Sequence, residues 1–139
     1  MEIDREILEK IIRQVLKEQN ECKVLSFSPL EVEISENDRL NTGNPEDKVY
    51  TKDLTTDKES KRLGMGVMEM EKTTFDWTLN YDEVDIVLEG TLSVISDGIT
   101  KTAQKNEMIF IPKGSSIKFS APDYAKFIYV TYPQDWQSQ

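Results

Sequence analysis

The chain contains no histidine and a single cysteine, Cys22, among its 139 residues. A site for iron, manganese or zinc is therefore not expected, because first-row transition metals in such a pocket depend on imidazole nitrogens. One cysteine also excludes an internal disulfide and a cysteine-based zinc site, since both need more sulfur ligands. The composition thus argues against transition-metal chemistry.

Long apolar runs and an excess of positive charge are missing as well. No apolar run approaches the ~18 residues that a membrane-spanning helix needs, and no secretory signal is apparent. The net charge of -9 argues against nucleic acid or an anionic membrane surface as the main partner, because phosphate binding needs clustered Lys and Arg. We expect a soluble, cytoplasmic protein.

The chain divides into three zones. Residues 1–19 place apolar side chains on one helical face and charged ones on the other, which predicts an amphipathic helix. Such a helix is marginal alone, so it either packs on the barrel or a second subunit, or docks on another protein. Residues 20–62 form a polar connector, in which the alternation at 23–34 predicts an edge strand.

Residues 63–139 consist of short strand-like runs separated by turn signals. Asp97-Gly98 lies between two such runs and predicts a tight hairpin. Several short strands at roughly ten-residue spacing indicate a closed or double-sheet antiparallel barrel. The predicted fold class is all-β, with an N-terminal helix appended.

Two stretches, "DEVDIVLEG" and "NEMIFIPKGSSIKF", resemble the paired signature boxes of the cupin superfamily. Glu83 and Gly90 keep the spacing of the first box, and Pro112 and Gly114 supply part of the second. The resemblance implies a jelly-roll β-barrel that dimerises through its sheets. The places of the usual histidine ligands hold other residues, which are Asp76 and Thr78 or, with the shorter spacing, Trp77 and Leu79, together with Ile117.

A narrower resemblance covers "MEMEKTTFDWTLNYDEVD", "IFIPKGSSIKFSAP" and "YVTYPQDW", which are similar to the EutQ family of ethanolamine utilization proteins. That resemblance implies a role in ethanolamine breakdown within bacterial microcompartments. It also implies acetate kinase activity, which interconverts ATP and acetate with ADP and acetyl phosphate, and therefore Mg²⁺ with ATP or ADP. Residues 1–19 would then dock the chain on shell or cargo proteins.

Strand alternation predicts what lines the barrel. If Glu83 points inward, Asp85 shares its face, and two buried carboxylates must pair with a cation, share a proton or stay wet. From the last strand, either Phe127, Tyr129 and Thr131 or the alternate residues Ile128, Val130 and Tyr132 point inward. The predicted pocket suits Mg²⁺, held by Glu83 and Asp85, or an amine cation, and its lining is Glu69, Glu71, Glu83, Asp85, Tyr81, Ser115 and Tyr129.

Phosphoryl transfer needs a positive charge, and Lys113 is the local candidate. The segment around it, "IPKGSS", also reads as an ordinary turn. The predicted catalytic residues are Glu83, Asp85 and Lys113. Asn80 and Tyr81 either close a turn or contact ligand at the barrel mouth, and Trp136 is expected on the barrel exterior or at a dimer interface. The alternative to an enzyme is a non-catalytic binding or scaffold barrel.

Overall fold

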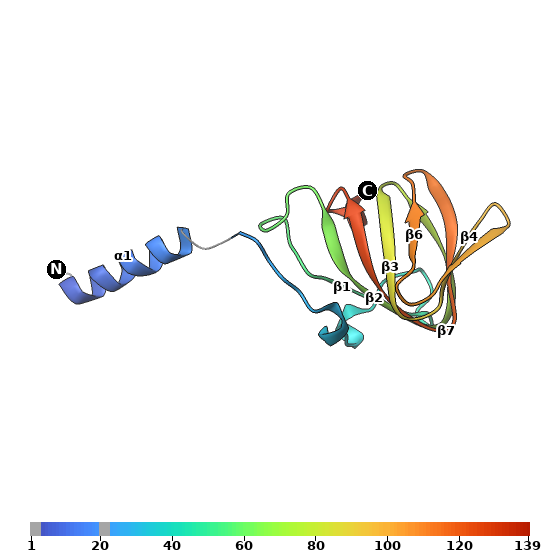
Figure 1. Ribbon diagram of the computed structural model, residues 1–139, viewed down its shortest axis with the longest axis horizontal. Helices are drawn as coiled ribbons and strands as arrows, with labels where there is room; N and C mark the ends of the chain where they lie inside the picture. Colours follow the sequence, from blue (N-terminus) through green and yellow to red (C-terminus); the bar gives the residue numbers. More distant parts are fainter. Residues whose placement is uncertain (1–3, 20–22) are drawn as a thin grey trace.

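The computed structural model describes residues 4–19 and 23–139, and it consists of one helix and an antiparallel β-barrel (Figure 1). Helix α1 spans Arg5–Gln19, and the Asp4 carboxylate accepts a hydrogen bond from the Glu6 backbone N–H at 2.9 Å. The apolar residues on α1 are 44–56 % exposed. Among the described residues no helix is both long enough and apolar enough to cross a bilayer.

The segment before the barrel is ordered by contacts with the sheet rather than by a strand. Residues 23–34 contain a short 3-10 helix, Pro29–Glu31, where the sequence predicts an edge strand, so that prediction is wrong. A second 3-10 helix spans Glu36–Asp38. The buried Lys126 side chain donates to the backbone oxygens of Leu30 and Val32 at 3.2 and 3.3 Å, and this holds the segment against the barrel.

Seven antiparallel strands form the barrel. Their order in the main sheet is β1-β2-β7-β3-β6, and β4 pairs with both β5 and β7. The long strands β2 and β7 pair along nearly their whole length, and the shorter strands β1, β3 and β4 pair with one or the other of them. The bounds are β1 Lys48–Asp53, β2 Gly64–Leu79, β3 Asp82–Gly90, β4 Leu92–Ser96, β5 Ile99–Ala103, β6 Met108–Ile111 and β7 Ser115–Tyr132, followed by the 3-10 helix η3, Trp136–Ser138.

The fold agrees with the predicted all-β barrel and its hairpin. Asp97 and Gly98 both adopt positive φ, 51° and 76°, between β4 and β5, as a tight two-residue hairpin turn requires. The edge strand lies at β1, within the predicted connector but downstream of the segment expected to form it. Most of the core fills the barrel interior.

A bulge in β2 decides which residues of that strand face inward. The register with β7 shifts between Glu71 and Thr73, and Lys72 has a positive φ of 45°. Before the bulge Met68 and Met70 point inward, whereas after it Phe75 and Leu79 do. A one-residue shift exchanges the two faces of a strand, so parity cannot be carried through the bulge.

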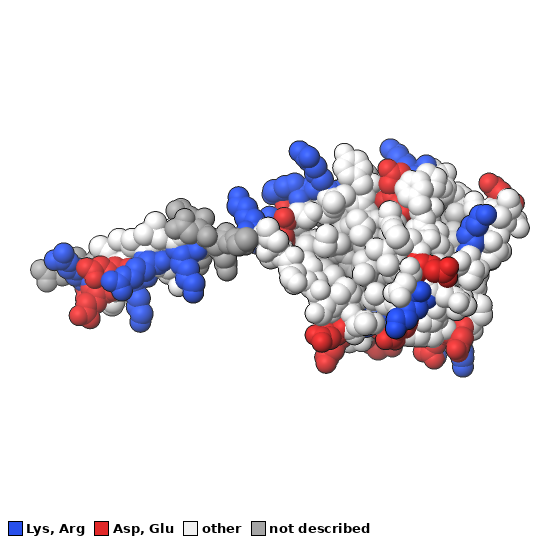
Figure 2. All heavy atoms as spheres, viewed as in Figure 1, with Lys and Arg blue, Asp and Glu red and all other residues white. Residues whose placement is uncertain are grey.

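The outer face of β7, β3 and β6 is apolar. Phe110 and Met108 of β6 are 64 % and 63 % exposed, and Val84 and Ile86 of β3 are half-buried. In the view of Figure 2, Lys, Arg, Asp and Glu gather mainly around the margins of the barrel, and its middle is largely free of them. This face is a candidate contact surface.

Candidate functional site

Glu83 and Asp85 point from β3 into the barrel. Glu83 is 3 % exposed and Asp85 is fully buried. Across the sheet, Glu83 lies opposite Ile111 of β6 and Thr131 of β7, and Asp85 lies opposite Ile109 and Tyr129. The alternation predicted from sequence therefore brings the two carboxyl groups together in the interior.

Neither carboxyl group has a charged partner among the described residues. In the described structure, Glu83 Oε2 and both Oδ atoms of Asp85 are buried with no hydrogen-bond partner outside the pair, so the two carboxyl groups can bond only to each other through a shared proton. None of the ion pairs in the described chain includes them. Burial raises the pKa of Glu83 to about 7. Burial, together with the nearby negative charge of Glu83, raises the pKa of Asp85 well above its usual range.

Aromatic rings close the barrel next to these carboxyl groups. The Trp136 ring, carried by η3, lies 5.9 Å from the Tyr81 ring, 5.6 Å from Tyr129 and 6.2 Å from Trp77. Trp136 is only 4 % exposed, so the prediction that it packs on the exterior is wrong. The C-terminus lies near the start of β3 in Figure 1, which agrees with this placement.

The tyrosine hydroxyls are fixed by hydrogen bonds. Trp77 Nε1 donates to the Tyr81 hydroxyl at 2.7 Å, and the Tyr129 hydroxyl donates to Asp53 Oδ1 at the end of β1. Burial raises the pKa of Tyr81, with the charge of Glu83 as the next cause, and burial also raises the pKa of Tyr129. Tyr81 and Tyr129 thus line the interior beside the carboxyl pair as neutral phenols.

Three predicted site residues lie at the rim of the same end of the barrel. Asn80 is exposed and its side chain donates to the Gln139 backbone oxygen at 3.4 Å. Lys113 is exposed in the β6–β7 turn, where its backbone N–H donates to Asp82 Oδ1 at 2.8 Å. Ser115 is half-buried and its hydroxyl donates to the Pro112 oxygen at 2.7 Å.

Glu69 and Glu71 do not belong to the interior, and their assignment to the pocket is wrong. They lie on the outer face of β2, where Glu71 is exposed and Glu69 pairs with Lys126 at 3.5 Å. The Tyr124 hydroxyl also donates to Glu69 at 3.3 Å. The reason is strand parity: before the bulge the even-numbered residues of β2 point inward.

The positions of the cupin histidine ligands are filled by large apolar side chains. Trp77, Leu79 and Ile117 point inward, which fits the shorter spacing of the first box, whereas Asp76 and Thr78 point outward. Within residues 4–19 and 23–139 no group of three or more His, Cys, Asp or Glu side chains is arranged to hold a metal ion. The donor set does not fit iron, manganese or zinc.

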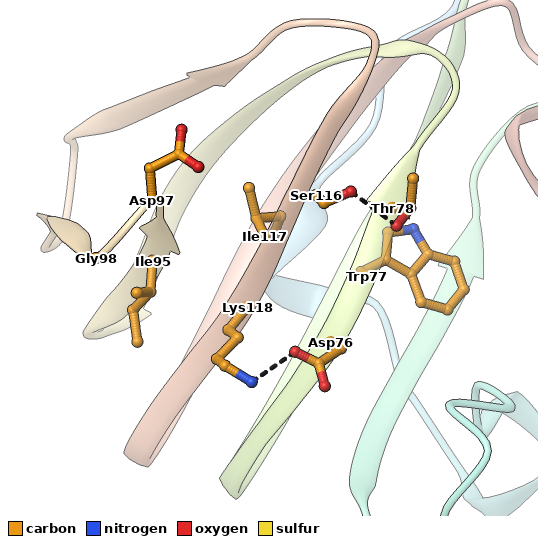
Figure 3. A pocket seen from close by; sticks show the side chains of 9 residues that line it. All are labelled: Asp76, Trp77, Thr78, Ile95, Asp97, Gly98, Ser116, Ile117 and Lys118. Carbon is orange, nitrogen blue, oxygen red and sulfur yellow. Dashed lines mark hydrogen bonds and ion pairs between the residues drawn. The ribbon is translucent and has the colours of Figure 1, made fainter.

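A surface hollow of about 340 Å³ lies on the outer side of β2 and β7, next to the β4–β5 turn (Figure 3). In it, Lys118 Nζ forms an ion pair with Asp76 Oδ1 at 2.6 Å, and the Thr78 and Ser116 hydroxyls form a hydrogen bond of 3.2 Å. These groups already satisfy each other. The hollow therefore offers a ligand fewer unpaired polar groups than the barrel interior does.

The sequence reasoning misplaced Trp136 and missed Asp53. Trp136 is buried although it follows the last strand in a tail with no periodicity, and Asp53, an exposed residue that accepts the Tyr129 hydrogen bond, stands in a polar connector, so neither carries a sequence signal of burial or contact. The only available cue is composition: a large aromatic residue in a short polar tail needs a surface to cover it.

Comparison with known proteins agrees with this fold. Residues 3–138 match the family model described as ethanolamine utilisation protein EutQ. The chain is 53 % identical to a Clostridioides difficile protein named acetate kinase EutQ, over 99 % of this chain and 96 % of the relative. The solved structure of the Clostridium difficile EutQ protein is similar, with a TM-score of 0.82 and 63 % identity, over 84 % of this chain and 85 % of that one. A cupin-2 domain protein from Shewanella frigidimarina matches at 27 % identity and a TM-score of 0.51, over 58 % of this chain and 76 % of that one.

Proposed function

Because the chain belongs to the EutQ family of ethanolamine utilisation proteins, we propose that it is an acetate kinase, which interconverts ATP and acetate with ADP and acetyl phosphate. The observation that carries this proposal is the 53 % identity, over 99 % of the chain, to a relative that bears the name acetate kinase EutQ.

The rim of the barrel suits the phosphoryl group better than the interior. In the forward reaction an acetate oxygen attacks the γ-phosphorus of ATP, and the bond to the ADP oxygen breaks as ADP leaves with its electron pair. Negative charge spreads over the transferred group and needs cations to stabilise it. Lys113 is an exposed cation at the rim, whereas the buried Glu83 and Asp85 carry no positive charge and, once ionised, would repel phosphate oxygens.

Mg²⁺, which the resemblance implies together with the nucleotide, does not fit the enclosed carboxyl pair. Mg²⁺ takes six oxygen ligands in near-octahedral geometry and usually keeps several waters. Glu83 and Asp85 lie against Tyr81, Tyr129 and isoleucine side chains, and they are shut off from solvent. No step of the reaction is therefore assigned to a metal held by this pair.

Replacing Lys113 with Ala is expected to lower kcat/KM for acetyl phosphate formation about 100-fold, a size typical for loss of a group that stabilises transition-state charge. The assay measures acetyl phosphate made from acetate and ATP, with and without Mg²⁺. Lys105→Ala, an exposed lysine in the turn before β6, is the matched control and should keep the full rate.

Two outcomes would count against the kinase proposal. Equal turnover by wild type and Lys113→Ala would remove Lys113 from the mechanism. Absence of turnover by the wild-type chain would reject the activity itself and favour a non-catalytic binding barrel. One observation already supports that second candidate: the carboxyl pair is enclosed by aromatic and apolar side chains and has no Lys or Arg partner in the described structure.

We further propose that the protein works inside a bacterial microcompartment and docks there through α1. The exposed apolar residues of α1 support this, because an isolated amphipathic helix needs an apolar surface to lie against.

The apolar outer face of β6 and β3 supports a homodimer, since the exposed Phe110 and Met108 side chains would be covered in its interface.

Deleting residues 1–19 tests the docking proposal. The barrel has its own core, so the truncated chain should unfold at an unchanged temperature, while co-sedimentation with purified compartments should fall at least tenfold. Replacing Ile11 and Val15 of α1 by Ser should have the same effect, because it removes the apolar face and keeps the chain length. Undiminished co-sedimentation of both variants would show that α1 does not dock.

A further inference from the structure

Among the described residues, the buried carboxyl groups of Glu83 and Asp85 have no hydrogen-bond donor other than each other. They occupy successive inward positions of β3, and a single shared proton leaves most of their oxygens without a donor. Buried polar atoms are normally paired, and an unpaired group in a low-dielectric interior is costly. These atoms are therefore candidates for contact with a ligand that donates hydrogen bonds.

The elements packed around the pair supply no positive charge. β6 contributes apolar side chains, β7 contributes a threonine and a tyrosine, and the β2–β3 turn contributes a second tyrosine. Lys126, the buried lysine of β7, points to the opposite face and is occupied by Glu69. The side chains opposite the pair in the sheet are Ile109, Ile111, Tyr129 and Thr131, and Tyr81 lies within reach of both charges.

We propose that a small primary ammonium ion binds between Glu83 and Asp85 inside the barrel. A primary ammonium group carries three N–H donors and would take the place of the single proton that the two carboxyl groups share. Its positive charge is attracted by the carboxylates and by the faces of neighbouring aromatic rings. Tyr129 lies opposite Asp85 across the sheet, and the charges of Glu83 and Asp85 act on Tyr81, so both rings lie beside the pair and would contact the carbon attached to the nitrogen.

The same features select an organic ammonium ion over other cations. Mg²⁺ would lose water ligands that the apolar and aromatic lining cannot replace. A quaternary ammonium ion is attracted by the rings but has no N–H to offer the carboxyl oxygens. The proposal is independent of the acetate kinase activity, because it concerns the interior of the barrel and not the rim around Lys113.

Trp136 has to move for the ligand to enter. The Trp136 ring contacts Trp77, Tyr81 and Tyr129 and closes the interior, and the carboxyl groups behind it are almost completely buried. Side-chain hydrogen bonds join the tail that carries Trp136 to the barrel: Trp136 Nε1 donates to Asp53 Oδ1 at 3.5 Å, and Asn80 donates to the Gln139 oxygen at 3.4 Å. Ligand binding is therefore expected to change the fluorescence of Trp136.

The test is isothermal titration calorimetry on the full chain at pH 8 with four probes. Ethylammonium and ethanolamine are expected to bind, and tetramethylammonium and Mg²⁺ to bind at least tenfold more weakly. Glu83→Gln combined with Asp85→Asn should weaken ethylammonium binding at least tenfold. Glu89→Gln removes an exposed carboxylate from the same strand and should change the affinity less than twofold.

Binding should also release protons, because a cation beside the pair favours the ionised carboxyl groups. Repeating the titration of the native chain in buffers of different ionisation enthalpy measures that release without relying on a variant. The proposal is overturned by no ethylammonium binding, by equal binding of tetramethylammonium, by preferential binding of Mg²⁺, or by unchanged affinity in the folded double variant. Kinase turnover without ammonium binding would reject this inference and leave the kinase proposal standing. Ammonium binding without kinase turnover would reject the kinase proposal and leave this inference standing.

Discussion

Glu83→Gln combined with Asp85→Asn is expected to remove most of the fall in stability that the wild-type chain shows between about pH 4.5 and pH 7. The pKa of Glu83 is raised in the folded state to about 7, so the folded chain binds more protons than the unfolded chain in this window. A raised folded-state pKa means that stability is fully present below pH 4.5 and is lost as the pH rises to 7.

The size of this effect depends on how far burial raises the pKa of Glu83. Each rise of one pH unit in this pKa corresponds to about 1.4 kcal/mol of unfolding free energy lost across the window. Asp85, whose pKa is also raised by burial, adds a loss in the same direction. The neutral Gln and Asn side chains cannot ionise, so the double variant should be more stable than wild type at pH 8.

Urea denaturation of both proteins between pH 4.5 and pH 8 measures the difference directly, with the m-value checked for constancy. Subtracting the two curves cancels the contributions of the other ionisable groups. Glu89→Gln, on the same strand but exposed, should follow the wild-type curve. Parallel curves for wild type and the double variant would show that the carboxyl pair ionises as it does in the unfolded chain.

Gly66→Ala is expected to destabilise the barrel by about 3 kcal/mol, the upper part of the range for overpacking a filled core. A Cβ atom at Gly66 would lie 2.1 Å from the Tyr129 hydroxyl, 2.3 Å from its Cζ and 2.6 Å from the Lys52 backbone oxygen. The Tyr129 ring cannot give way easily, because Trp136 packs against it and its hydroxyl bonds Asp53. Thermal and urea unfolding measure the loss.

A double-mutant cycle separates this clash from other effects of the alanine. Tyr129→Leu removes the hydroxyl and Cζ atoms that the new Cβ would meet, so Gly66→Ala should cost at least about 1 kcal/mol less in that background. Additive losses would place the cost of the substitution elsewhere, for example at the Lys52 oxygen. In that case Tyr129 would not be held against β2 as the structure shows.

The sequence predicts the part of the site that regular alternation governs. Glu83 and Asp85 share a face because they stand two apart on an uninterrupted stretch of β3, and the inward set containing Tyr129 is one of two sets that parity allows on β7. The antiparallel barrel and the Asp97-Gly98 hairpin were accessible because turn chemistry and strand spacing are local properties, whereas the cupin type of the barrel came from the resemblance of the two boxes.

The rest depends on features without a local pattern. The bulge at Lys72 exchanges the inward and outward faces of β2, so alternation along this strand does not show that Glu69 points outward. The edge strand β1 is a short, half-exposed run in a polar segment, so it resembles a loop in composition. Trp136 reaches the interior through long-range packing against rings from distant parts of the chain, which no periodicity encodes.

The central claim is that the barrel encloses a carboxyl pair that functions as a cation site. The most direct measurement is a carboxyl ¹³C NMR titration of Glu83 and Asp85 in the full chain, with and without ethylammonium. We predict that Glu83 titrates near pH 7 and Asp85 well above its usual range, and that ethylammonium lowers both midpoints. Ordinary carboxyl midpoints that ethylammonium leaves unchanged would contradict the account.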